Sequence, residues 1–333
     1  MSLPMSKKRF DPFDPMFRWV AFAAATFLLV MLGGMIVSLL IGGWPTIAKF
    51  GLNFFLKFQA CESGHGVCLS DEWNTQTDTY VATVPILGTL ISSVFSLAMA
   101  LPIAIGIAVF LTQFCPDFIA NPIGLAIELL AGIPSIVYGM WGLFVFAPFF
   151  AAHVQAPIMM SLAEGLAHHP DSLWLKFWMG ITQGVPNGAN ILTASIILAI
   201  MILPYMSSVF RELFRSVPPQ VREAAFGMGC TPLEAITKVI IPFVQKGMVG
   251  VIMLGFGRAL GETMAVTFII GNSHRFPKSI FDAGSTLSSV IANEFAEAGP
   301  GQASALIALG LVLFLITFGV LAMARALLSQ QRY

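Results

Sequence analysis

Residues 19–41 read WVAFAAATFLLVMLGGMIVSLLI and contain no charged residue. A helix needs about 20 mostly apolar residues to cross the hydrocarbon core of a bilayer, so this stretch is long enough to span a membrane. A basic segment precedes it, as in a signal peptide, but the apolar run is too long for one and has no clear A-x-A cleavage site. The sequence therefore predicts an uncleaved membrane anchor.

Similar apolar stretches follow along the chain, and the predicted spans are residues 17–41, 84–111, 131–152, 191–210, 248–271 and 303–327. A membrane β-barrel would instead have shorter segments that alternate between apolar and polar residues. Prolines within the stretches, such as Pro134 and Pro204, mark bends. The sequence predicts an all-α polytopic membrane protein with about six transmembrane helices.

The composition agrees with this prediction. Of 333 residues, 57% are hydrophobic and only 10% are charged, whereas soluble domains carry roughly 25% charged residues. The mean hydropathy is +0.83, so membrane lipid is an expected partner. The formal net charge of zero argues against binding to nucleic acid.

The basic residues predict the orientation, because cytoplasmic loops are richer in Lys and Arg than the loops outside. With an even number of spans, both termini lie on one side, and most of the 17 Lys and Arg residues fall there. They are Lys7, Lys8, Arg9, Arg18, Arg211, Arg215, Arg222, Lys238, Lys246, Arg325 and Arg332. Both termini are therefore expected in the cytoplasm.

The spans also predict how the chain is divided. We expect a cytoplasmic tail, a first transmembrane helix, an outside loop, a membrane core and a second cytoplasmic tail, at residues 1–16, 17–42, 43–83, 84–329 and 330–333. Within the core, residues 211–246 are charged but keep helical spacing, which predicts a folded cytoplasmic loop.

Residues 223–229 of that loop read Glu-Ala-Ala-Phe-Gly-Met-Gly, and Val-Ile-Ile-Pro follows at residues 239–242. Glycine permits turns that other residues avoid, and proline interrupts helices. The pattern predicts a short helix, a turn at Gly229 and a second helix that stops near Pro242. Taken alone, it also fits an amphipathic hairpin on the membrane surface.

The spacing resembles the Glu-Ala-Ala loop of type I ABC importer permeases, with Val239 and Ile241 as conservative departures. In that family, the loop docks into a groove of the ATPase subunit and transmits its closure to the membrane helices. The resemblance implies that the coupling residues of this chain are Glu223, Ala224, Ala225, Gly229 and Pro242.

Residues 127–142, 253–272 and 292–297 are similar to phosphate-importer permeases of the PstC type. This resemblance implies a permease subunit in the bacterial inner membrane that forms half of the path for inorganic phosphate. It also implies a PstA-like sister permease, two PstB-like ATPase subunits that hydrolyse ATP and a PstS-like periplasmic phosphate-binding protein. The chain itself is expected to have no enzymatic activity and no cofactor.

Two charged residues, Arg258 and Glu262, fall within the fifth predicted span, where a charge is costly. Because they are four residues apart, a continuous helix would place them on one face. Arg258, Glu262 and Thr263 are expected along the substrate path. Arg258 offers a fork of donors that matches phosphate oxygens, Thr263 adds a hydroxyl, and Glu262 would hold Arg258 in place while the path is empty. The alternative is a structural ion pair between Arg258 and Glu262.

The first outside loop contains Cys61 and Cys68, with His65 between them. In an oxidising compartment, two cysteines this close in sequence can form a disulfide. A metal site and free thiols remain as alternatives, and the sequence predicts no other metal site.

Two rival functions remain open. One is a permease of the same architecture for another oxyanion, such as molybdate or sulfate, because charge alone does not separate these anions from phosphate. The other is an ion-coupled secondary transporter, which should show repeat symmetry and needs no loop for docking an ATPase.

Overall fold

The computed structural model describes residues 14–55, 57–60, 67–69, 73–74 and 77–330. Among these residues, six helical segments are long and apolar enough to cross a membrane. They are Met16–Phe54, Thr83–Phe114, Ser135–His168, Ile191–Arg215, Pro232–Gly261 and Pro300–Ala326. The predicted fold class is confirmed: the chain is an all-α multi-pass membrane protein.

The α-helices are α1 (Asp14–Phe50), α2 (Thr83–Val109), α3 (Asp117–Ala131), α4 (Ser135–Trp141), α5 (Ala147–Phe150), α6 (Ala156–His168), α7 (Leu173–Thr182), α8 (Ile191–Arg215), α9 (Pro219–Gly227), α10 (Pro232–Glu234), α11 (Ile241–Gly261), α12 (Met264–Ile269), α13 (Leu287–Glu294) and α14 (Pro300–Gln330). Wider π-helical turns extend or join some of them: η2 (Phe110–Phe114), η3 (Gly142–Phe146), η4 (Ala151–Gln155) and η5 (Ala235–Ile240). Short 3-10 helices are η1 (Gly51–Phe54) and η6 (Phe295–Glu297).

Between α1 and α2, the described residues form four short strands. They are β1 (Phe58–Ala60), β2 (Val67–Leu69), β3 (Trp73–Asn74) and β4 (Thr79–Tyr80). They form two antiparallel pairs, β1 with β2 and β3 with β4. In the first pair, Gln59 lies opposite Cys68.

Helix α8 lies at the centre of the bundle. Of its most apolar window, 67% is buried inside the chain, compared with at most 28% for any other candidate span. Side chains such as Ile202, Phe210 and Phe214 are fully buried, and α2, α3 and α11 all pack against the helix. Because most of its apolar window is buried, α8 serves as the core around which the other spans pack.

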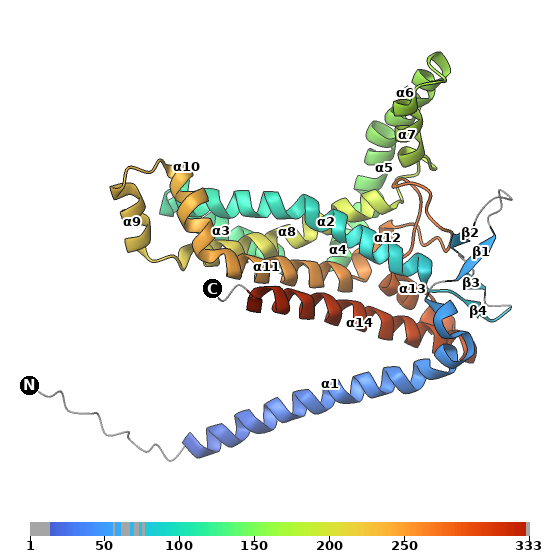
Figure 1. The fold of residues 1–333 in the computed structure, drawn as a ribbon, viewed down its shortest axis with the longest axis horizontal. Helices are drawn as coiled ribbons and strands as arrows, with labels where there is room; N and C mark the ends of the chain where they lie inside the picture. Colours follow the sequence, from blue (N-terminus) through green and yellow to red (C-terminus); the bar gives the residue numbers. More distant parts are fainter. Residues whose placement is uncertain (1–13, 56, 61–66, 70–72, 75–76, 331–333) are drawn as a thin grey trace, which may run out of the picture.

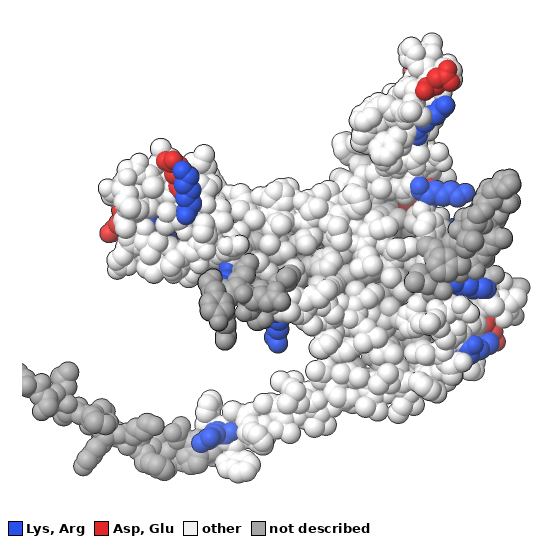
Figure 2. All heavy atoms as spheres, in the orientation of Figure 1, with Lys and Arg blue, Asp and Glu red and all other residues white. Residues whose placement is uncertain are grey.

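The two ends of the bundle differ in structure. Figure 1 shows α9 and α10 at one end, together with the first turn of α1 and the last turns of α14. At the other end lie the strands, α13 and the α6–α7 hairpin, which projects sideways from the bundle. Figure 2 shows that Lys, Arg, Asp and Glu gather toward these two ends on the face it draws, with an uncharged band between them.

Helix α1 joins the bundle only near its C-terminal end, where it packs against α14. Small residues allow the close approach: a Cβ added to Gly43 would lie 3.1 Å from the Cα of Ala308. Nearby, the Thr46 hydroxyl donates to the Ser304 hydroxyl. The rest of α1 leaves the bundle and exposes apolar side chains such as Phe22 and Leu29, as a helix in contact with lipid does.

Two predicted boundaries are wrong. The third span, predicted at residues 131–152, starts instead at Ser135, and a separate helix, α3, lies before it between Pro116 and Pro134. Its predicted end at residue 152 is also wrong, because the helical segment continues to His168 through α6, which forms a hairpin with α7. In that hairpin, Gly165 lets the Leu175 side chain approach α6.

Candidate functional site

The first part of the candidate site is the loop between α8 and α11. The predicted helix and turn are present: α9 ends at Gly227, and Gly229 has φ of +86°, a conformation that disfavours residues with a Cβ. The next helix begins at a capping box, in which Thr231 and Glu234 each bond to the other's backbone N–H. The loop is therefore folded, as expected, and its turn depends on glycine.

Most of this loop is exposed. Glu223 and Ala224 face solvent, whereas Ala225 is buried against the rest of the chain. The large apolar side chains of Phe226, Met228 and Leu233 are exposed as well. An exposed group of apolar side chains at a charged end of a membrane protein is typical of a surface that binds another protein.

The prediction that the second helix stops near Pro242 is wrong. Helix α11 begins at Ile241, and residues 232–261 form one continuous helical segment. The π-helical turn η5 precedes Pro242, and the Ile241 N–H donates to the Ile236 carbonyl, five residues earlier. The widened turn lets the helix accommodate a proline, which lacks an N–H and would crowd a regular α-turn.

The second part of the candidate site surrounds Arg258, near the end of α11. Its guanidinium carbon lies 5.3 Å from the centroid of the Tyr205 ring on α8, in the range of a cation–π contact. Among the residues that the structure describes, Arg258 forms no ion pair. A half-buried guanidinium without a carboxylate partner can accept an anionic ligand.

Arg258 and Glu262 do not lie on one continuous helix, contrary to the prediction. Helix α11 ends at Gly261, Glu262 is extended with ψ of 126°, and α12 starts at Met264. The Glu262 carboxylate accepts a long hydrogen bond of 3.4 Å from the Ala265 N–H, and the Glu262 carbonyl accepts one from the Ser288 hydroxyl at 2.7 Å. Glu262 is thus hydrogen-bonded to α12 and α13 at the break between α11 and α12, beside Thr263.

Two glycines near Arg258, Gly257 and Gly261, border open space within the described part of the chain. A Cβ added to Gly257 or Gly261 would meet no heavy atom within 4 Å. The spacing of these glycines suggests close helix packing, but in the described part of this chain no helix packs against them. The close approach is made instead at Gly255, where a Cβ would lie 2.6 Å from the Met206 sulfur.

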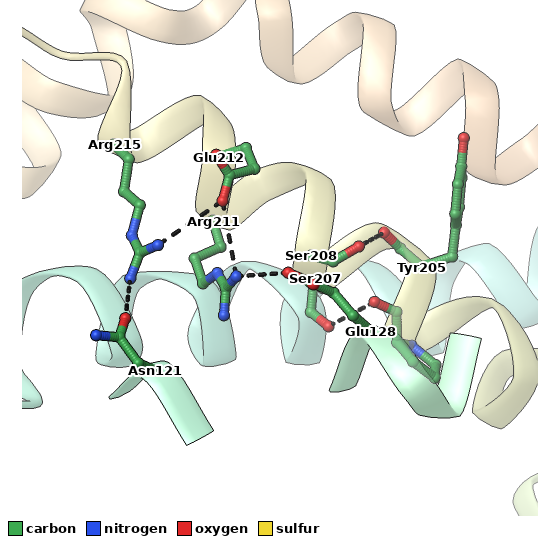
Figure 3. Close-up of polar contacts among 9 residues, drawn as sticks. Asn121, Glu128, Tyr205, Ser207, Ser208, Arg211, Glu212 and Arg215 are labelled. Carbon is green, nitrogen blue, oxygen red and sulfur yellow. Dashed lines mark hydrogen bonds and ion pairs between the residues drawn. The ribbon is translucent and has the colours of Figure 1, made fainter. Parts of the chain in front are cut away.

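A third group of polar residues was not predicted as a site, and Figure 3 shows it. Arg211 of α8 donates to Glu128 of α3 at 2.6 Å, and Arg215 donates to Asn121 of α3 at 3.2 Å. The sequence carried a signal for this face, because Asn121, Gly124 and Glu128 are spaced i, i+3 and i+7 on α3. Their partners on α8 were not predictable, since they lie more than 80 positions away in the sequence.

A fourth polar group lies at the opposite end of the bundle. Glu294 accepts hydrogen bonds from the Trp73 indole at 2.8 Å and from the Gln302 amide at 2.7 Å. It also contacts His274 at 2.8 Å, and the Trp73 and His274 rings are stacked. Burial raises the pKa of Glu294, but the hydrogen bonds from His274, Trp73 and Gln302 outweigh it and hold the pKa below its usual range.

The predicted disulfide stays a prediction. Cys61 lies outside the described residues, and only the backbone of Cys68 is described, in β2. The two other cysteines, Cys115 and Cys230, are free thiols and are half-buried.

The chain is similar to known proteins over almost its whole length. Residues 79–333 match the family model described as "Binding-protein-dependent transport system inner membrane component". The chain is 45% identical to the phosphate transport system permease protein PstC of Mesorhizobium japonicum, over 97% of this chain and 92% of that protein. It is 43% identical to the protein of the same name from Haemophilus influenzae, over 99% of this chain and 98% of that protein.

One solved structure shows a weaker likeness. It is an inward-facing MetNI methionine ABC transporter, with a TM-score of 0.48 and 16% identity over 74% of this chain and 93% of that chain. The matches to the family model and to the two full-length relatives are much stronger than this structural likeness. The chain therefore belongs to the family of binding-protein-dependent transport system inner membrane components, as a relative of the PstC phosphate transport system permeases.

Proposed function

We propose that this chain is the permease subunit of an ATP-driven importer of inorganic phosphate, in which it forms half of the transmembrane path. The observation that carries the proposal is the similarity to proteins named phosphate transport system permease PstC, at 43–45% identity over nearly all of both chains. As a permease, the chain is not itself catalytic. ATP hydrolysis is assigned to two PstB-like ATPase subunits.

The loop between α8 and α11 is the proposed docking element for an ATPase subunit. Its exposed face carries Glu223, Ala224 and the apolar Phe226, Met228 and Leu233. The two helices α9 and α10 are joined by a turn at Gly229, whose positive φ is accessible mainly to glycine. Since α9 follows α8 and α10 leads into α11, a movement of the loop would reach two spans directly.

Arg258 is the proposed contact for phosphate along the path. It is a half-buried positive charge with open space at Gly257 and Gly261, and its forked donors suit phosphate oxygens. Thr263 adds a half-buried hydroxyl close to the break after α11. Glu262 would repel an anion through its charge, but its hydrogen bond to α12 gives it a local structural role.

The proposed setting is the bacterial inner membrane, with both termini and α9 in the cytoplasm. Among the described residues, Lys and Arg are more numerous at the α9 end than at the α13 end, as the positive-inside rule requires of a cytoplasmic face. A PstA-like sister permease would complete the path. A PstS-like phosphate-binding protein would deliver phosphate at the α13 end.

The proposal is tested by uptake of radiolabelled phosphate in cells that lack this chain. We expect the parental chain to restore energy-dependent uptake that unlabelled sulfate and molybdate do not reduce. Gly229→Arg should abolish uptake, because a side chain at φ of +86° strains the turn and adds bulk to the docking face. Gly180→Arg is the matched control, since Gly180 lies on α7, outside the docking loop, and a Cβ there would meet no heavy atom within 4 Å.

Each alternative function predicts a different result. Competition by sulfate or molybdate, without uptake of phosphate, would identify a permease for another oxyanion. If the Gly229→Arg chain is still inserted in the membrane and takes up phosphate at the parental rate, the result argues against ATPase docking. It would then favour an ion-coupled secondary transporter.

A further inference from the structure

Arg211 is a buried cation at the α9 end of α8. Its side chain is only 8% exposed, and its Nη2 atom lies 2.6 Å from an oxygen of Glu128 on α3. Glu212 lies farther away, with 3.6 Å between the nearest atoms. The principal partner of the buried guanidinium is therefore on another helix, and the contact joins α8 to α3 (Figure 3).

A glycine on α3 makes room for this guanidinium. A Cβ added to Gly124 would lie 1.1 Å from the Nη1 atom of Arg211, so alanine at position 124 is incompatible with the observed side-chain position. The clash would fall on the end of a flexible side chain and not on the backbone of α8. A second contact, from Arg215 to Asn121, lies one turn of α8 nearer the loop.

Stability alone does not account for a buried arginine here. Burying a cation costs free energy, and the pair repays the cost only with good geometry and complete hydrogen bonding. The Glu128 side chain is 48% exposed, which weakens the attraction through solvent screening. The Nε atom of Arg211 is also buried, with no hydrogen-bond partner among the described residues. An apolar pair would join the two helices at lower cost.

The position of the contact suggests another role. Helix α8 continues through residues 216–218 into α9, the proposed docking helix. Helix α3 bends into α4 at residues 132–134, and the Tyr138 hydroxyl donates to the Leu130 carbonyl across the bend. Helix α4 then packs closely against α12, where a Cβ on Gly139 would lie 3.0 Å from the Cα of Ala265.

We propose that Arg211, Gly124 and Glu128 form an α3–α8 clamp that makes α3 follow α8 when the docking loop moves. Through α3 and α4, this movement reaches α12, which starts directly after Glu262 and Thr263. Arg211 is then a positioning residue that links ATP hydrolysis to the transport path. The inference rests on the proposed function as an ATP-driven permease, and it holds for any transported anion.

The test measures transport per ATP hydrolysed. This chain is reconstituted in liposomes with its sister permease, ATPase subunits and binding protein, and uptake of labelled phosphate and release of ADP are followed in the same vesicles. Glu128→Gln removes the charge that Arg211 contacts, and Gly124→Ala displaces the guanidinium. Each change should lower the ratio of phosphate transported to ATP hydrolysed about fivefold or more, a typical size for coupling between sites.

Two variants control for unrelated effects. Gly106→Ala adds a Cβ to another helical glycine, on α2, where it meets nothing within 4 Å. Glu164→Gln removes an exposed carboxylate from α6, far along the chain from the clamp. Both should keep the parental ratio. Because Glu128→Gln and Gly124→Ala break the same contact, the double variant should fall no further than the single variants.

Several results would overturn the proposal. One is that both clamp variants, assembled in normal amount, transport as much phosphate per ATP hydrolysed as the parental complex does. Another is a fall of transport and hydrolysis by the same factor, which indicates a structural role only. Additive effects in the double variant would show that the two residues do not share one contact. If the parental complex carries another oxyanion and not phosphate, the ratio is measured with that anion, and only the proposed substrate fails.

Discussion

The guanidinium of Arg258 lies over the ring of Tyr205, 5.3 Å from its centroid, and forms no ion pair with Glu262 in the described part of the chain. Helices α11 and α8 therefore meet at a cation and an aromatic face. Because the ring is neutral, it positions the guanidinium without cancelling its charge. That arrangement leaves the forked donors of Arg258 able to bind an anion.

Removing the aromatic ring should impair uptake, whereas removing only its hydroxyl should not. Tyr205→Phe keeps the face that Arg258 contacts and should retain parental phosphate uptake at limiting phosphate. Tyr205→Leu removes the cation–π contact, worth about 0.5–2 kcal/mol, and should lower the uptake rate about threefold. Equal rates for the Phe and Leu variants would show that the ring does not position Arg258.

The shape of the Arg258 side chain should matter as well as its charge. Arg258→Lys keeps the positive charge but loses the planar fork, so uptake should fall on the order of tenfold, as expected from one lost charge-assisted hydrogen bond. Arg325→Lys, at an exposed position of α14, should leave uptake unchanged. Parental uptake with Arg258→Lys would reduce the role of this position to charge alone.

The hydrogen bond at the break after α11 predicts which substitutions of Glu262 are tolerated. Glu262→Gln keeps an oxygen that can accept from the Ala265 N–H and should remain near parental in stability. Glu262→Ala removes that acceptor and should cost about 1 kcal/mol, as for the loss of one hydrogen bond. Thermal unfolding of the purified chain in detergent measures both. If Gln destabilises the chain as much as Ala does, the negative charge matters more than the hydrogen bond.

A glycine near the hairpin provides a test of the fold. Gly188 has φ of +77°, and a Cβ there would lie 2.1 Å from the Ala147 carbonyl oxygen. Gly188→Ala should therefore destabilise the chain by about 2 kcal/mol or more, through backbone strain and a clash with backbone atoms. Gly180→Ala, within α7 and with nothing within 4 Å, should be neutral or slightly stabilising. Unfolding temperatures of the two variants, measured side by side, check the difference.

The hydrogen bonds around Glu294 predict that the stability of the folded chain depends on pH. The pKa of Glu294 is lower in the folded chain than in the unfolded chain, so the stabilisation is present above the unfolded value and is lost as pH falls through the folded one. Acidification from about pH 6, above the ordinary range of a glutamate, into the range of the folded pKa should lower the unfolding temperature of the parental chain more than that of Glu294→Gln. Glu297→Gln, at an exposed position three residues on, is the control. An equal acid response in the parental and Glu294→Gln chains would exclude this contribution.

Patterns in short stretches of sequence predicted those parts of the site whose structure depends on residues adjacent in the chain. The turn at Gly229 follows from glycine's access to positive φ, and the loop around it is folded as its spacing indicated. The same reasoning failed at Pro242, because the π-helical turn η5 absorbs the proline and the helix continues. It failed again at Gly261, where α11 ends although the predicted span runs on to Gly271.

The number of spans was determined by the sequence itself, because a hydrocarbon core of given thickness requires apolar helices of a minimum length. The turn at Gly229 was likewise determined locally, by the steric freedom of one residue. Only the tertiary structure decided that Arg211 meets Glu128 and that Arg258 meets Tyr205. Those pairs join helices that are distant in the sequence, and their contacts depend on how the helices pack, which no local pattern of residues specifies.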